Sequence, residues 1–130
     1  MSRLNYTTTP WPVIVEYYRD DVSGSVNHPF APMLVLLEKI ALSRYVYGLY
    51  GNKSMWDLRI VQTQEYDPDG EGLIIKYDPD RQEFGFELQE AASALHKRWT
   101  RKCVAEDAFR TFEQFLQSKK WFIEEKTADP

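Results

Sequence analysis

Two short turn sequences, each built around an Asp-Pro pair, constrain the fold of this chain more than any other feature. They are residues 67–72 (DPDGEG) and 78–82 (DPDRQ). Asp favours tight turns because its side chain hydrogen-bonds to nearby backbone, Pro because its φ is fixed, and Gly because it can adopt positive φ. The flanking segments, residues 56–64, 73–77 and 83–88, alternate apolar with polar side chains or are rich in β-branched residues. This pattern predicts three antiparallel strands in a meander with one wet face.

The alternation also predicts the register of this sheet. One face should be buried beneath at least one helix, and it should carry Trp56, Leu58, Ile60, Phe84, Phe86 and Leu88. The other face should carry Asp57, Arg59 and Glu87, because successive side chains of a strand point to opposite sides.

The rest of the chain supplies further elements. Residues 13–18 are β-branched and aromatic and predict another strand. Residues 31–50 predict a long helix with Pro32 in its first turn. Its apolar stripe consists of Leu34, Leu37, Ala41 and Tyr45 and is widened by Met33, Leu36, Ile40 and Tyr47. Residues 44–50 are also strand-like, so the alternative is a helix that ends near Ser43 and is followed by a strand.

The C-terminal part contains one ambiguous segment and one clear helix. Residues 89–95 fit a short helix, and residues 98–104 fit either a fourth strand or a backward extension of the last helix. Residues 105–119 predict that last helix, with a stripe of Ala108, Phe109, Phe112, Phe115 and Leu116. We therefore expect an α+β fold in which an antiparallel meander of about four to five strands packs against two main helices.

The 130 residues are close to the usual size of one domain. We expect a flexible N-terminal arm over residues 1–10, a single α+β domain over residues 11–122 and a frayed C-terminal tail over residues 123–130. The only cysteine, Cys103, has no partner for an internal disulfide. The N-terminus has no apolar signal-peptide region, and the longest apolar stretch, residues 33–37, is far shorter than the roughly 20 residues that span a bilayer. The expected location is cytoplasmic, without a membrane partner.

Charge is distributed unevenly along the chain, whose net charge is −4. Residues 61–95 contain nine acidic side chains against Lys76 and Arg81, whereas residues 96–104 contain four basic side chains, no acid and one aromatic ring, that of Trp99. The pattern predicts an acidic face on the meander followed by a basic segment, an asymmetry that can steer a charged partner. The candidate partner-binding residues are Asp67, Asp69, Asp78, Asp80 and Trp99.

No residue pattern predicts a catalytic, metal or cofactor site. His96 and Cys103 could form a nucleophile and its base, but nothing in their spacing brings them together, and Cys103 is expected to be a small core residue. Asp67, Asp69 and Glu71 lack the register of a calcium loop. The two histidines and one cysteine of the chain are fewer than the four Cys and His ligands of a structural zinc site.

These features favour a non-catalytic domain that binds another protein through an acidic and aromatic-rich face, and a basic protein is the candidate partner that such a face suits. Trp and Tyr are preferred anchors at interfaces, and the chain has four Trp and eight Tyr. In size, charge and expected arrangement the chain is similar to bacterial immunity proteins, which neutralise toxins. That similarity implies an inhibitor-type function.

Three alternatives stay open. A small enzyme would draw on His28, His96, Cys103 and tyrosines. A single-stranded nucleic acid could bind the basic segment around Trp99, although the acidic balance disfavours it. The chain could also form a homodimer through an edge strand.

Overall fold

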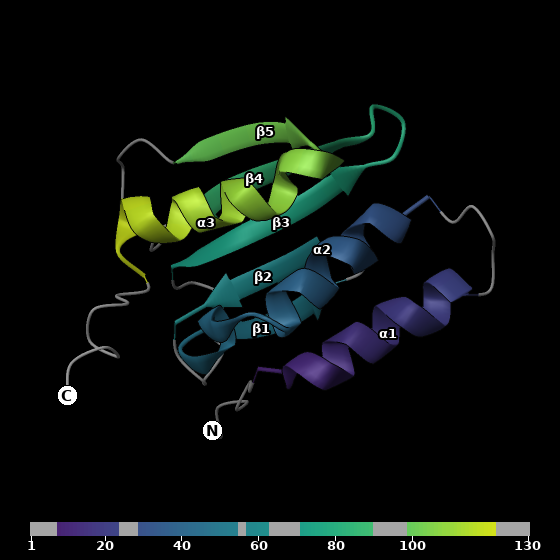
Figure 1. Ribbon diagram of the computed structural model, residues 1–130, viewed down its shortest axis with the longest axis horizontal. Helices are drawn as coiled ribbons and strands as arrows, with labels where there is room; N and C mark the ends of the chain where they lie inside the picture. Colours follow the sequence, from purple (N-terminus) through teal and green to yellow (C-terminus); the bar gives the residue numbers. More distant parts are fainter. Residues whose placement is uncertain (1–7, 24–28, 55–56, 63–70, 90–98, 122–130) are drawn as a thin grey trace, which may run out of the picture.

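The computed structural model describes residues 8–23, 29–54, 57–62, 71–89 and 99–121. Within these ranges, five antiparallel strands form one sheet in the order of the chain: β1 (Tyr50–Ser54), β2 (Asp57–Val61), β3 (Gly72–Asp78), β4 (Glu83–Gln89) and β5 (Thr100–Val104). The same residues form three α-helices, α1 (Trp11–Ser23), α2 (Ala31–Ala41) and α3 (Ala108–Lys119), and two 3₁₀ turns, η1 (Arg44–Tyr47) and η2 (Ala105–Asp107). The helices lie on one side of the sheet, with α3 over β3–β5, α2 over the β1–β2 side and α1 beyond α2 (Figure 1). The α+β class is confirmed.

The predicted register of the meander is confirmed where the structure describes it. Leu58 pairs with Ile75, and Ile75 pairs with Phe86, so these side chains share one row and one face. They are buried under the helices. Trp56 lies outside the described residues.

The opposite face of the sheet is less uniformly wet than the alternation predicts. Lys76 and Lys102 are exposed there, but Arg59 is only 7% exposed. Its guanidinium lies over Gly72, where a Cβ would come within 2.8 Å of Arg59 Cζ, and Nη1 donates a hydrogen bond to Gln89 Oε1. The missing side chain of Gly72 therefore makes room for a buried arginine.

The strand predicted at residues 13–18 is wrong, because this segment belongs to α1. Trp11, Ile14, Val15 and Tyr18 are buried at the i, i+3, i+4, i+7 spacing of a helix, while Val13 is exposed. Pro12 suits the first turn of a helix, where its missing N–H has no partner to lose. Burial of one helical face thus outweighs the β preference of the individual side chains, and in the described residues α1 is added to the two main helices that the sequence predicts.

The long helix predicted over residues 31–50 is also wrong, and the alternative in which a strand follows a shorter helix is closer. The helix ends at Ala41, and Ser43 turns the chain: its hydroxyl donates to the carbonyl of Ile40 and accepts from the N–H of Tyr45. Within α2 the predicted stripe is confirmed at Met33, Leu36, Leu37 and Ile40, which are buried, whereas Leu34 and Ala41 are half-buried.

At the C-terminal end, residues 100–104 form a strand, as one of the two interpretations expects. The last helix begins with η2 and continues as α3. Helix α3 ends in a Schellman motif, in which Lys120 adopts the left-handed conformation. The N–H of Lys120 donates to the carbonyl of Gln117, and the N–H of Trp121 donates to the carbonyl of Leu116. The segment 89–95, apart from Gln89 in β4, lies outside the described residues.

The described part of the expected N-terminal arm contacts the sheet. Thr9 forms a β-bridge with Gly51, and its N–H donates to the Gly51 carbonyl at 2.9 Å. This bridge lies on the outer edge of β1.

Candidate protein-docking surface

The acidic candidates that the structure describes, Asp78 and Asp80, lie exposed in the turn between β3 and β4. Asp78 Oδ1 accepts hydrogen bonds from the N–H of Asp80 at 3.0 Å and from the N–H of Arg81 at 3.4 Å. The carboxylate of Asp78 therefore shapes the turn in addition to carrying charge. Asp67 and Asp69 lie outside the described residues.

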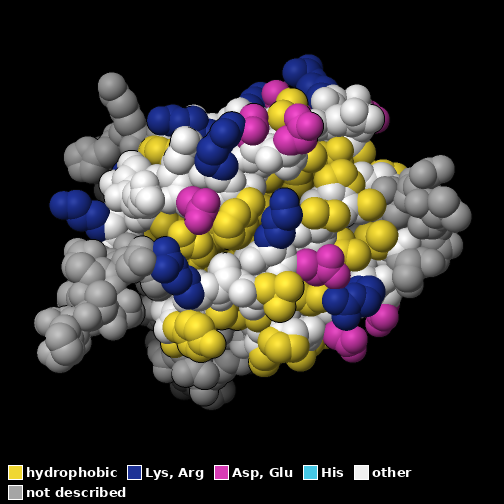
Figure 2. All heavy atoms as spheres, in the orientation of Figure 1, with side chains coloured by type: hydrophobic (Ala, Val, Ile, Leu, Met, Phe, Trp, Pro, Cys, Tyr) yellow, Lys and Arg dark blue, Asp and Glu magenta, His cyan; other side chains and the backbone are white. Residues whose placement is uncertain are grey.

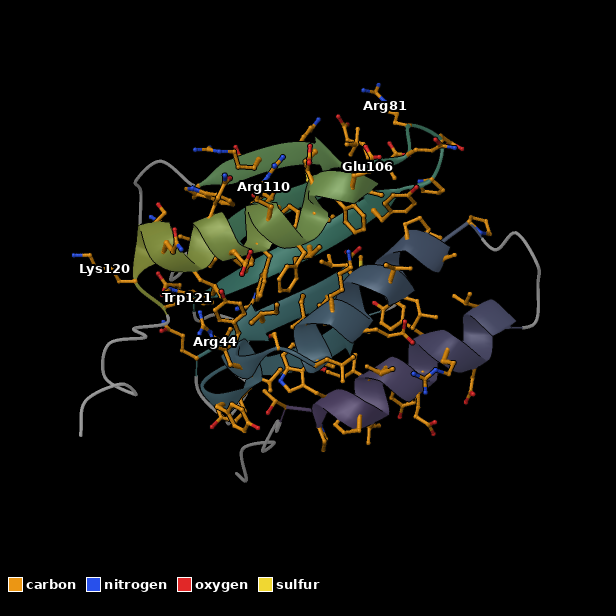
Figure 3. The ribbon with its side chains drawn as sticks, in the orientation of Figure 1. Arg44, Arg81, Glu106, Arg110, Lys120 and Trp121 are labelled. Carbon is orange, nitrogen blue, oxygen red and sulfur yellow. The ribbon has the colours of Figure 1, made fainter. Side chains whose placement is uncertain are left out.

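Basic side chains are interspersed with these acids. Lys76 Nζ lies 3.9 Å from Asp57 Oδ2, and Arg110 Nη2 lies 2.6 Å from Asp107 Oδ1. On the helical side, Lys and Arg alternate with Asp and Glu instead of gathering by sign (Figure 2). Arg81 projects from the tip of the β3–β4 turn itself (Figure 3). In the described part of the chain the surface is thus mixed in charge rather than uniformly acidic.

Trp99 faces the helical side of the sheet and packs within the protein. Its ring meets Phe115 edge-on at 5.0 Å between centroids, and the Arg101 guanidinium lies 4.8 Å over its ring. Binding of a single-stranded nucleic acid would require the indole of Trp99 to stack on a base, and these two contacts already engage that indole. Lys97 and Arg98 lie outside the described residues.

Cys103 is half-buried on the same side of the sheet. Burial raises the pKa of its thiol above the ordinary value, which keeps it protonated near neutral pH and makes it a poor nucleophile.

His28 and His96 lie outside the described residues. Within the described ranges, no three His, Cys, Asp or Glu side chains form a group that could hold a metal ion. In the same ranges, none of the helices has the length and apolar character that crossing a membrane requires.

The surface that stands out is the outward face of α2, the middle helix. Only Glu38 and Lys39 among its 11 residues are charged. A helix that is apolar on nearly all sides is normally buried. Here Val35 is 51% exposed, and Leu42, which caps the helix, is 89% exposed.

A groove lies on each side of α2. The larger one, between α1 and α2, has a volume of about 760 Å³ and includes Val13, Val15, Ala41 and Leu42 in its lining. At its rim, Arg19 Nη2 lies 2.9 Å from Glu38 Oε2. The smaller groove, of about 290 Å³, separates α2 from α3 and is lined by Pro32, Val35, Leu36, Lys39, Ala108 and Phe109, among others. Hydrophobic side chains reach the surface over this region (Figure 2).

We call the outward face of α2, with Val35, Glu38, Lys39 and Leu42, the α2 face. Sequence reasoning treats this helix as core and misses its exposed side. The signal is nevertheless present in residues 31–42, whose apolar content exceeds what a helix with one solvated side needs.

Comparison with protein-family models, curated protein sequences and solved structures finds no significant match.

Proposed function

We propose that this chain is a non-catalytic domain that binds another protein chain through the α2 face and its two flanking grooves. The observation that carries the proposal is the exposure of Val35 and Leu42 on the most apolar helix of the layer. Large apolar side chains that lie exposed together on one face are typical of protein-interaction sites. Full burial of side chains of this kind contributes about 1.5–3 kcal/mol each.

The shape of the surface supports a protein partner over a small molecule. Small ligands bind in concave sites that enclose most of their surface. Leu42 instead protrudes, and a protruding apolar side chain is desolvated only when a partner supplies a complementary pocket. The grooves beside α2 can in turn receive side chains of the partner.

The finer proposal of an immunity or inhibitor-type function, directed at a basic protein, draws its support from the β3–β4 turn. Asp78 and Asp80 are exposed there. Charges at the rim of an interface act mainly on the rate of encounter, so this turn would guide the approach of a basic partner.

Two matched substitutions test the main proposal. Val35→Glu places a charge on the α2 face, whereas Val104→Glu places one on the other side of the sheet at a valine of nearly equal exposure, 51% against 50%. Each variant and the parent chain are tagged, expressed in the source cells, and their bound polypeptides are compared. A bound polypeptide lost with Val35→Glu and retained with Val104→Glu is expected. Loss with Val104→Glu alone, or with neither variant, contradicts the proposal.

A further inference from the structure

We infer that the occupant of the α2 face is a second copy of this chain, packed about a twofold axis that passes between Glu38 and Lys39. This inference rests on the proposed function and names its partner. It follows from the order of four residues along α2 and from what lies beside each of them.

The four residues share one face of the helix. Val35, Glu38, Lys39 and Leu42 follow the i, i+3, i+4, i+7 spacing, and at about 100° per residue they fall within an arc of roughly 100°. Val35 and Leu42 are exposed, Lys39 is exposed and Glu38 is half-buried. The face therefore reads apolar, acidic, basic, apolar from its N-terminal to its C-terminal end.

This order is complementary to itself when it is reversed. Val35 precedes Glu38 by as many positions as Leu42 follows Lys39. In an antiparallel pair related by a twofold axis, Val35 meets Leu42 of the partner subunit, and Glu38 meets Lys39 of the partner subunit. Each apolar side chain then meets an apolar one and each charge meets its opposite, which an isologous interface requires.

The ion pairs of the isolated chain leave these charges available. Among the described residues, Lys39 makes no ion pair. Glu38 binds Arg19 through Oε2, and a carboxylate can accept more than one donor. The partner subunit's Lys39 would therefore join an Arg–Glu pair already in place at the rim of the larger groove.

The grooves fit the same arrangement. Val35 and Lys39 line the groove between α2 and α3, so the partner subunit's Leu42 approaches that groove. Leu42 and Glu38 line the groove between α1 and α2, which the partner subunit's Val35 approaches. The two grooves and the α2 face together form one surface across the helical layer.

The edges of the sheet favour this route over a dimer built by strand pairing. On β1, the outer edge is already bridged by Thr9. On β5, Arg101 and Lys102 are exposed, and charged side chains on an edge strand oppose pairing between copies.

Charge exchange tests the register of the interface. Sedimentation velocity of the purified full chain should show a dimer that dissociates on dilution. Glu38→Lys and Lys39→Glu should each weaken the dimer at least about tenfold, because each places like charges opposite one another at two symmetric positions. An equimolar mixture of the two variants should recover the parent affinity, because every contact between positions 38 and 39 then joins opposite charges.

The controls are Glu83→Lys and Lys102→Glu on the other face of the sheet, which should leave the dimer unchanged. A chain that stays monomeric at all concentrations overturns the inference, and so does a dimer that neither substitution weakens or that the mixture fails to restore. Recovery in the mixture also separates lost complementarity from a folding defect. If the chain is monomeric and a different polypeptide is lost with Val35→Glu in cells, the proposed function stands and only the second copy is refuted.

Discussion

The indole N–H of Trp11 donates a hydrogen bond to the carbonyl oxygen of Leu49 at 3.0 Å, across 38 residues of sequence. Both residues are buried, so water cannot replace either partner. This bond fixes the start of α1 against the residue that precedes β1. It therefore ties the outermost helix of the layer to the edge of the sheet.

Trp11→Phe should lower the free energy of unfolding by about 1–3 kcal/mol, because it leaves the buried Leu49 carbonyl without its donor. Urea unfolding followed by circular dichroism measures the change. Val13→Ala, at an exposed position of the same helix, is the control and should cost much less. Equal stability of Trp11→Phe and the parent chain would show that the bond contributes nothing.

The local side of this architecture is legible in the sequence, whereas the placement of α1 is not. Asp78 and Pro79 define their turn through neighbouring backbone groups, so the strands beside it follow from sequence alone. Residues 13–18 carry β-branched and aromatic side chains, and their helix depends on a surface formed by α2 and β1. The i, i+3, i+4, i+7 spacing of Trp11, Ile14, Val15 and Tyr18 is a helical signal in the sequence, but the β preference of the individual residues points the other way.

The candidate site shows the same division. The exposure of Asp78 and Asp80 follows from their turn, but the position of Trp99 depends on Phe115, which comes from α3. The α2 face depends on how much of an apolar helix its neighbours cover. That quantity is a property of the assembled layer, so sequence reasoning recovers the helix and misses its exposed side.

Gly51 allows α1 to approach β1 closely. A Cβ at this position would lie 2.8 Å from Ile14 Cδ1 and 3.1 Å from Trp11 Cη2, both in the core. Gly51→Ala should therefore destabilise the chain by about 1–3 kcal/mol. Gly85→Ala is the matched control, since nothing lies within 4 Å of its Cβ position, and it should be neutral or slightly stabilising. Thermal unfolding of both variants decides the point, and a Gly51→Ala variant as stable as Gly85→Ala would refute the close approach.

Lys120 adopts the left-handed conformation with φ 57° and ψ 38° at the end of α3. An L side chain pays about 1–2 kcal/mol in this region, and glycine does not. Lys120→Gly should therefore raise the melting temperature. Lys119→Gly, one residue earlier in the helix, should lower it, because glycine costs helical residues about 1 kcal/mol. A melting temperature that falls in both variants would argue against the Schellman ending.

Cys103 should react slowly with alkylating reagents near neutral pH. Burial raises the pKa of its thiol, so the reactive thiolate is scarcer than in an exposed cysteine. Because the pKa of the thiol is higher in the folded chain, folding stabilises the protonated form below the pKa of the unfolded state, and this stabilisation is lost as pH rises through the pKa of the folded state. For the same reason, the alkylation rate of Cys103 plotted against pH should reach its midpoint at a higher pH than the rate of a cysteine peptide. A midpoint below the peptide value would indicate an activated thiol.

The central claim, that the α2 face is covered by another protein chain, is tested most directly by photo-crosslinking. A photoreactive residue is placed at position 42, which is 89% exposed on the α2 face, or at position 104 on the other face of the sheet. After irradiation of the source cells, position 42 should join the chain to a second polypeptide of defined mass, and position 104 should not. Defined adducts from position 104 with none from position 42 would contradict the account.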